Sequence, residues 1–114
     1  MALAEVDGCI YDVDQFRLSR GFEGLDPIGR EAFVNHLHLN GADRAAAAEQ
    51  NIKSWVAEMR ARWPESAFRI YRQVEDDEVT IRFHMVRLGL PNWCEGGIEI
   101  IDVDGRSAEQ FYGL

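Results

Sequence analysis

Two aspartates at strand-like spacing are the first residues of this chain that could do chemistry. Asp12 and Asp14 lie two positions apart in a segment predicted as a strand, so both carboxylates point to the same side. Such a pair could hold a hard cation, although two carboxylates fall short of the about six to eight oxygens that calcium usually takes. The alternative is a solvated strand end, the usual place for aspartate.

The histidines give no metal motif. His36 and His38 are i and i+2 in a segment predicted as helix, roughly 200° apart around the axis, so we do not expect them to share a metal ion. His84 falls on the polar side of a predicted strand, where a surface or interface position is favoured over catalysis. With no Cys-x-x-Cys pattern and no phosphate-binding glycine loop, the sequence predicts neither a metal nor an organic cofactor.

The two cysteines, Cys9 and Cys94, are too few for a disulfide framework. We expect free thiols in a reducing cytosol, with a single bridge as the alternative. The first residues lack the basic and apolar regions of a signal peptide. No apolar run approaches the roughly 18 residues that span a bilayer. The expectation is a cytoplasmic protein without a membrane segment.

Length and charge limit the partners. The 114 residues predict one α+β domain over residues 1–114. The net charge of −8 argues against nucleic acid and against an anionic membrane surface, because both need basic patches. Two interpretations stay open: the charge serves solubility, or it attracts a basic partner protein.

Hydrophobic periodicity predicts the elements that must position these residues. A strand is expected over 9–18, a helix from Asp26-Pro27 to the Asn40-Gly41 stop signal, and a long helix over 43–63. The long helix carries one apolar stripe, formed by Ile52, Trp55, Val56, Met59 and Trp63.

After the long helix the period changes to two, which predicts antiparallel hairpins. With Val74 opposite Val79, the register places Phe68 opposite Met85 and gathers the large apolar side chains on one face. The turn between these strands, 75–78, is wholly acidic. A second hairpin is expected at Asp104-Gly105, joining strands 98–103 and 106–112. Two helices against a curved antiparallel sheet of about five strands are the expected α+β architecture.

The segment from Met59 to Tyr112 resembles the second half of a SnoaL-like domain, of the nuclear transport factor two and ketosteroid isomerase superfamily. The resemblance is carried by these short motifs: Arg62-Trp63-Pro64, Phe68-Arg69-Ile70, Val79–Phe83 and Gly97–Arg106, with looser likeness at Gly29–Phe33 and Tyr11–Asp14. It implies a cone-like fold with an apolar pocket between the long helix and the sheet.

The resemblance also implies roles. Glu99 corresponds to an inward acidic residue that donates to an oxyanion, with a pKa raised by burial; Asp12 or Asp14 would be the base. The alternative for Glu99 is a solvated side chain or a pair with Arg72. The residues expected to line the pocket are Trp55, Met59, Phe83, Ile101 and Tyr112, with core packing as the alternative for the tryptophan. A homodimer through the outer sheet face is also implied.

Two functions follow as hypotheses. The first is a binding protein or proton-transfer enzyme (isomerase-, cyclase- or hydratase-like) for a small apolar molecule. The chain lacks the family's first helices and the catalytic tyrosine that they carry, which argues against a steroid isomerase. The second is a non-catalytic acidic module of the inhibitor or immunity type, suggested by the net charge and the acidic 75–78 turn. A structural dimer with a vestigial pocket is a third alternative.

Overall fold

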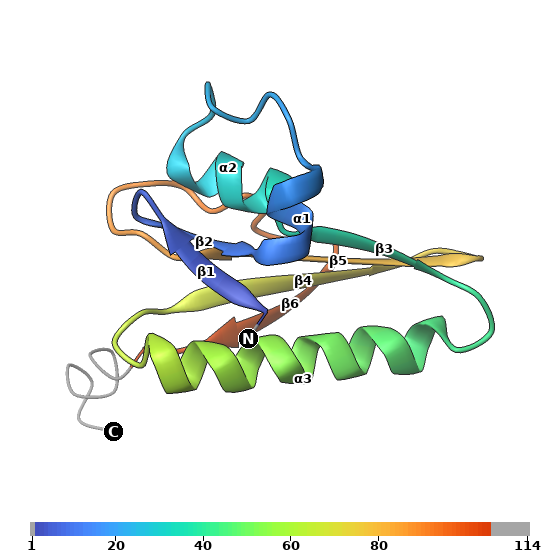
Figure 1. Ribbon diagram of the computed structural model, residues 1–114. Helices are drawn as coiled ribbons and strands as arrows, with labels where there is room; N and C mark the ends of the chain where they lie inside the picture. The colour runs from blue at the N-terminus through green and yellow to red at the C-terminus, as the bar shows by residue number, and fades with distance from the viewer. Residues whose placement is uncertain (1, 106–114) are drawn as a thin grey trace.

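A four-stranded antiparallel sheet is the centre of the fold in the computed structural model, which describes residues 2–105. Its strands run in the order β3-β5-β4-β6. Their bounds are β3 His36–Asn40, β4 Phe68–Val74, β5 Glu78–Met85 and β6 Glu99–Val103. Helix α3, Arg44–Arg62, lies along the sheet on one side (Figure 1).

The N-terminal part forms a second unit beside the sheet. Strands β1, Leu3–Val6, and β2, Cys9–Asp12, make a separate antiparallel hairpin. Two short helices follow, α1 over Val13–Leu18 and α2 over Pro27–Val34, and they lie away from α3 in Figure 1. The described chain is therefore α+β with antiparallel sheets, as the sequence predicts.

The core lies between α3 and the sheet. The apolar stripe of α3 faces inward, and Trp55 packs edge-to-face on Phe83 with ring centroids 4.7 Å apart. Ile52 and Met59 are buried in the same cluster as the strand residues. Burying side chains of this size stabilises the fold by about 1.5–3 kcal/mol each. The predicted helix and its inward face are confirmed.

The predicted register of the first hairpin is also confirmed. Val74 pairs with Val79, Ile70 with Phe83, and Phe68 with Met85. β6 adds to the other side of β4, with Ile101 opposite Ile70 and Glu99 opposite Arg72. The predicted partner strand 106–112, and with it Tyr112, lies outside the described residues. The main sheet has four strands in the described residues, and its membership differs from the expected sheet of about five. The strand expected over 9–18 pairs with β1 in a separate sheet, while β3, expected as helix, joins the main sheet.

Two predicted boundaries are wrong. The strand expected over 9–18 ends at Asp12, whose side chain accepts a hydrogen bond from the Gln15 N–H and so caps α1. The helix expected to continue to Asn40 ends at Val34, and the next residues form β3. The alternation of His36, Leu37 and His38 has a period of two, and the β5 ladder satisfies its backbone.

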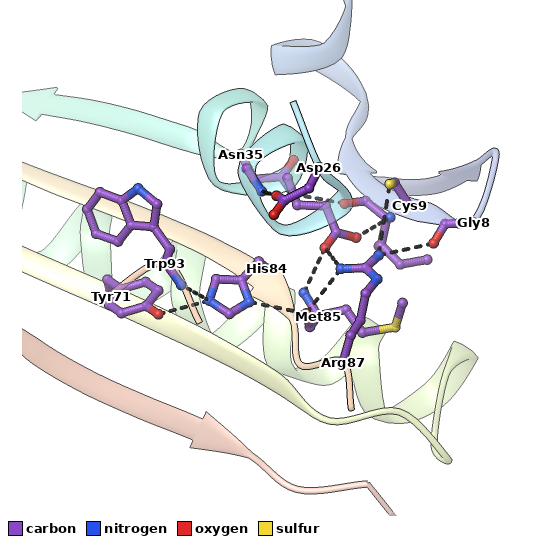
Figure 2. Close-up of polar contacts among 12 residues, drawn as sticks. Gly8, Cys9, Asp26, Asn35, Tyr71, His84, Met85, Arg87 and Trp93 are labelled. Carbon is purple, nitrogen blue, oxygen red and sulfur yellow. Dashed lines mark hydrogen bonds and ion pairs between the residues drawn. The ribbon is translucent and has the colours of Figure 1, made fainter. Parts of the chain in front are cut away.

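A buried carboxylate, the ion-pair partner of the Arg87 labelled in Figure 2, joins the N-terminal hairpin to the sheet. Glu31, wholly buried on α2, accepts hydrogen bonds from the Ile10 N–H at 2.7 Å and from the Met85 N–H at 2.9 Å. Its Oε1 lies 2.6 Å from Arg87 Nη1. The Arg87 guanidinium also donates to the Gly8 carbonyl. One carboxylate therefore holds α2, β2 and the end of β5 together.

The side chain of Asn35 adds to this connection, because its amide forms the two hydrogen bonds with β2 that a neighbouring strand would form. Its side-chain Oδ1 accepts from the Asp12 N–H, and its Nδ2 donates to the Ile10 carbonyl, both at 2.8 Å. Its own backbone carbonyl accepts from the Phe83 N–H. The buried backbone of β2 is thus satisfied without a neighbouring strand on this side.

Removing the Glu31 charge should destabilise the protein strongly. We expect Glu31→Gln to lower the free energy of unfolding by about 3–5 kcal/mol, because it leaves the Arg87 cation largely buried without its counter-charge. Urea denaturation followed by circular dichroism measures this. Glu49→Gln is the matched control, since the Glu49–Arg72 pair is half exposed and should cost about 1 kcal/mol or less. Equal losses of unfolding free energy in the two variants would show that Glu31 does not hold the N-terminal hairpin to the main sheet.

Candidate functional site

A buried tyrosine–histidine pair lies on the face of the sheet opposite α3. The Tyr71 hydroxyl is 2.8 Å from His84 Nε2, and both side chains are almost wholly buried. The loop after β5 covers them: the Trp93 N–H donates to His84 Nε2 (Figure 2). The Cys94 N–H donates to the Tyr71 oxygen. The prediction that His84 points away from the α3 core is confirmed, but its predicted surface position is wrong, because this loop buries it.

The hydrogen bonds fix the tautomer of His84. Its Nδ1 lies 3.1 Å from the Met85 carbonyl, which can only accept, so Nδ1 carries the proton and Nε2 accepts. Burial lowers the pKa of His84, an effect to which the charges of Arg69 and Arg87 add and which the Met85 carbonyl and Glu31 oppose. The neutral ring therefore anchors the loop on the outer face of the sheet.

Arg82 packs against the loop that covers Tyr71 and His84. Its guanidinium stacks over the Trp93 ring at 4.2 Å from the centroid and donates to the Ala32 carbonyl at 2.9 Å. Among the described residues no carboxylate forms an ion pair with it. Trp93, Cys94 and their loop thus occupy the middle of the outer sheet face, where a homodimer contact was expected.

Glu99 lies in a different environment from the one expected. Its carboxylate is half exposed, and Arg72 donates to both oxygens, at 3.0 and 2.6 Å. This guanidinium lowers the pKa of Glu99, so the expected rise of that pKa is wrong. Arg72 also pairs with Glu49 from α3 at 2.8 Å. The pair with Arg72 was the alternative that the sequence left open, and Glu99 is held as an anion.

The two aspartates have separate positions. Asp12 is nearly buried; one oxygen caps α1 and the other accepts from Trp55 Nε1 at 3.3 Å. Asp14 lies in the first turn of α1 and is exposed. Because the strand ends at Asp12, the premise that both carboxylates share one strand face is wrong. The structure brings neither of them to Glu99, which lies at the edge of the main sheet.

The residues expected to line a pocket lie in or against the core. Trp55, Met59 and Phe83 are buried in one hydrophobic cluster, and Ile101 packs against it partly buried. Core packing, the alternative for Trp55, describes their contacts. The space between α3 and the sheet that the resemblance assigns to a ligand is occupied by these side chains.

Carboxylates gather instead at the end of the sheet where the β4–β5 turn and the start of α3 meet. We call this the acidic end; its acidic residues are Asp43, Glu49, Glu75, Asp76, Asp77, Glu78 and Glu99. Figure 1 shows the turn beside the β3–α3 connection. The Arg44 guanidinium donates to the carbonyls of Gly41 and Asp76, which ties the two segments together.

A groove lies at the acidic end, with a volume of about 420 Å³. Its lining is partly apolar and consists of Ala42, Arg44, Ala45, Arg72, Val74, Val79 and Glu99. Val74 is 68% exposed, although its position on the inner face of the hairpin predicts burial. Here the sheet extends beyond the core, which leaves an apolar surface next to the carboxylates.

Comparison with protein-family models, curated proteins and solved structures gave no match. Among residues 2–105, no three histidine, cysteine or acidic side chains lie together as a metal site, and no helix is long and apolar enough to cross a membrane. Cys9 and Cys94 are free thiols. The resemblance to SnoaL-like domains stays a prediction.

The lowered pKa of His84 makes the folded state sensitive to acid. The unfolded chain binds a proton on this ring near pH 6.5, whereas the folded chain binds it only at lower pH, so stability falls as pH drops below about 6.5. We expect the loss of unfolding free energy between about pH 7.5 and 5.5 to be smaller in His84→Gln than in the wild type. Urea denaturation at each pH measures it.

His38→Gln is the control for the pH experiment, because this histidine is exposed. The pH dependence should flatten more in His84→Gln than in this control, whatever the overall stability of either variant. An identical pH dependence in the wild type and His84→Gln would contradict the proposed neutral anchor.

Proposed function

We propose that this chain is a non-catalytic interaction module that binds a basic partner protein through its acidic end. The observation that carries the proposal is the gathering of exposed carboxylates around a partly apolar groove at one end of the sheet. A surface that combines charge of one sign with exposed apolar area is suited to a complementary protein surface.

The two arginines at the acidic end already have hydrogen-bond or ion-pair partners within the chain. Arg72 is held between Glu49 and Glu99, and Arg44 donates to carbonyl oxygens. Within residues 2–105 no ion pair involves Glu75, Asp76 or Asp77. Their negative field therefore reaches solvent, where it would speed the approach of a positively charged surface.

The groove favours a particular kind of side chain. Lysine and arginine bury an aliphatic stem while keeping a charged head in water. Such a stem would pack against the exposed side chain of Val74, which lines the groove and directly precedes the acidic 75–78 turn in the chain. This chemistry favours a partner segment rich in lysine or arginine over one that is only apolar.

The enzymatic hypothesis has less support. Proton transfer or oxyanion binding by Glu99 requires its neutral form, and Arg72 stabilises the charged form. The SnoaL-like assignment, with its cone-like fold, apolar ligand and dimer, remains a separate proposal from the resemblance alone. The geometry favours binding over catalysis.

A labelled lysine- and arginine-rich peptide tests the proposal as a probe. We expect it to bind the full chain with an affinity that falls as salt concentration rises. Asp76→Asn with Asp77→Asn should weaken binding roughly two- to thirtyfold, since each of the two exposed charge contacts is worth about 0.2–1 kcal/mol. Fluorescence anisotropy over a salt series measures both effects.

The control removes equal charge elsewhere. Asp14→Asn with Glu23→Gln leaves the acidic end intact, and both side chains are exposed. This variant should bind the peptide as the wild type does. If both double variants lose affinity equally, or if the peptide does not bind, the charge serves solubility and the proposal fails.

A further inference from the structure

Two histidines stand side by side on the edge strand of the main sheet. Because His36 and His38 lie in β3 and not in a helix, residues two apart point to the same face. Their rings are 5.1 Å apart, centroid to centroid, and nearly perpendicular. The helical argument against a shared metal ion therefore no longer applies.

Each ring has its Nδ1 occupied by a protein acceptor. His36 Nδ1 contacts the Phe33 carbonyl, which can only accept, so this nitrogen carries the proton. His38 Nδ1 lies 3.1 Å from Thr80 Oγ1 and 3.4 Å from a Glu78 carboxylate oxygen. In the neutral rings this leaves the lone pair on Nε2. Metal-binding histidines typically donate their other ring N–H to a carbonyl or carboxylate in this way.

The separation of the rings suits one ion. With metal–nitrogen bonds of about 2.0–2.1 Å and a tetrahedral angle, two imidazoles on one zinc ion have ring centres roughly 5 Å apart. We propose that His36 and His38 together form a site for a divalent transition metal that prefers imidazole, such as Zn²⁺, with water in the remaining positions.

Charged side chains near the two histidines have opposite effects on the binding of a cation. Arg82 pairs across from His36 and repels a cation, while Glu78, next to His38, attracts one. Burial lowers the pKa of His36, helped by Arg82 and His38 and opposed by the Phe33 carbonyl, so the ring is neutral at pH 7 and ready to bind. With two protein ligands, the site is weaker than a structural zinc site with four.

Titration of the full chain with ZnCl₂ tests the site. Isothermal calorimetry should give one ion per chain, and the NMR signals of His36 and His38 should move while those of buried His84 do not. Binding should weaken as pH falls, because protons compete for the imidazoles. Thr80→Val, which removes the acceptor for His38, should weaken zinc binding by about tenfold.

A composition-matched variant separates a chelate from scattered histidines. His38→Gln with Gln50→His moves one imidazole to the exposed side of α3 and leaves charge and histidine content unchanged. It should bind zinc at least roughly tenfold more weakly than the wild type, since two ligands no longer act on one ion. Equal affinity in this variant, or a zinc response at His84 alone, would overturn the proposal. Circular dichroism verifies that the variant is folded.

Discussion

The arrangement depends on one buried carboxylate. Glu31 is wholly buried, and a charge in this position is tolerated only when paired and hydrogen-bonded. Two backbone N–H groups and Arg87 meet this need, and they come from β2, from the end of β5 and from the residues just after it. The requirement of Glu31 for three partners therefore fixes the N-terminal hairpin against the sheet.

This constraint also determines how α2 ends and β3 begins. With Glu31 fixed, Asn35 stands four residues later, where its amide pairs with β2 and its backbone carbonyl joins β5. The chain leaves the helix at this point and runs as an edge strand. The outward direction of His36 and His38 follows from that exit, because the alternation of β3 places Leu37 and Leu39 toward the core.

The spacing of apolar residues predicts those elements whose structure depends mainly on their own stretch of sequence. The stripe of α3 and the register of β4 with β5 follow from spacings of 3.6 and 2. The strand at His36 could have been predicted from its alternating leucines, but the Asp26-Pro27 start and the Asn40-Gly41 stop favoured a continuous helix. The partners of Glu31 could not be predicted, since they come from segments distant in sequence and are chosen by packing.

The ion pair between Glu99 and Arg72 could have been predicted from the sequence. Arg72 was the one charged residue on the apolar face of the predicted hairpin, opposite Ile81. A cation there needs an anion on the same face, and β6 supplies it by pairing Glu99 with Arg72. Along β4 the same face thus changes from core at Phe68 and Ile70 to exposed surface at Val74. At the acidic end the start of α3 leaves Val74 uncovered, so the carboxylates border an apolar side chain that the core does not bury.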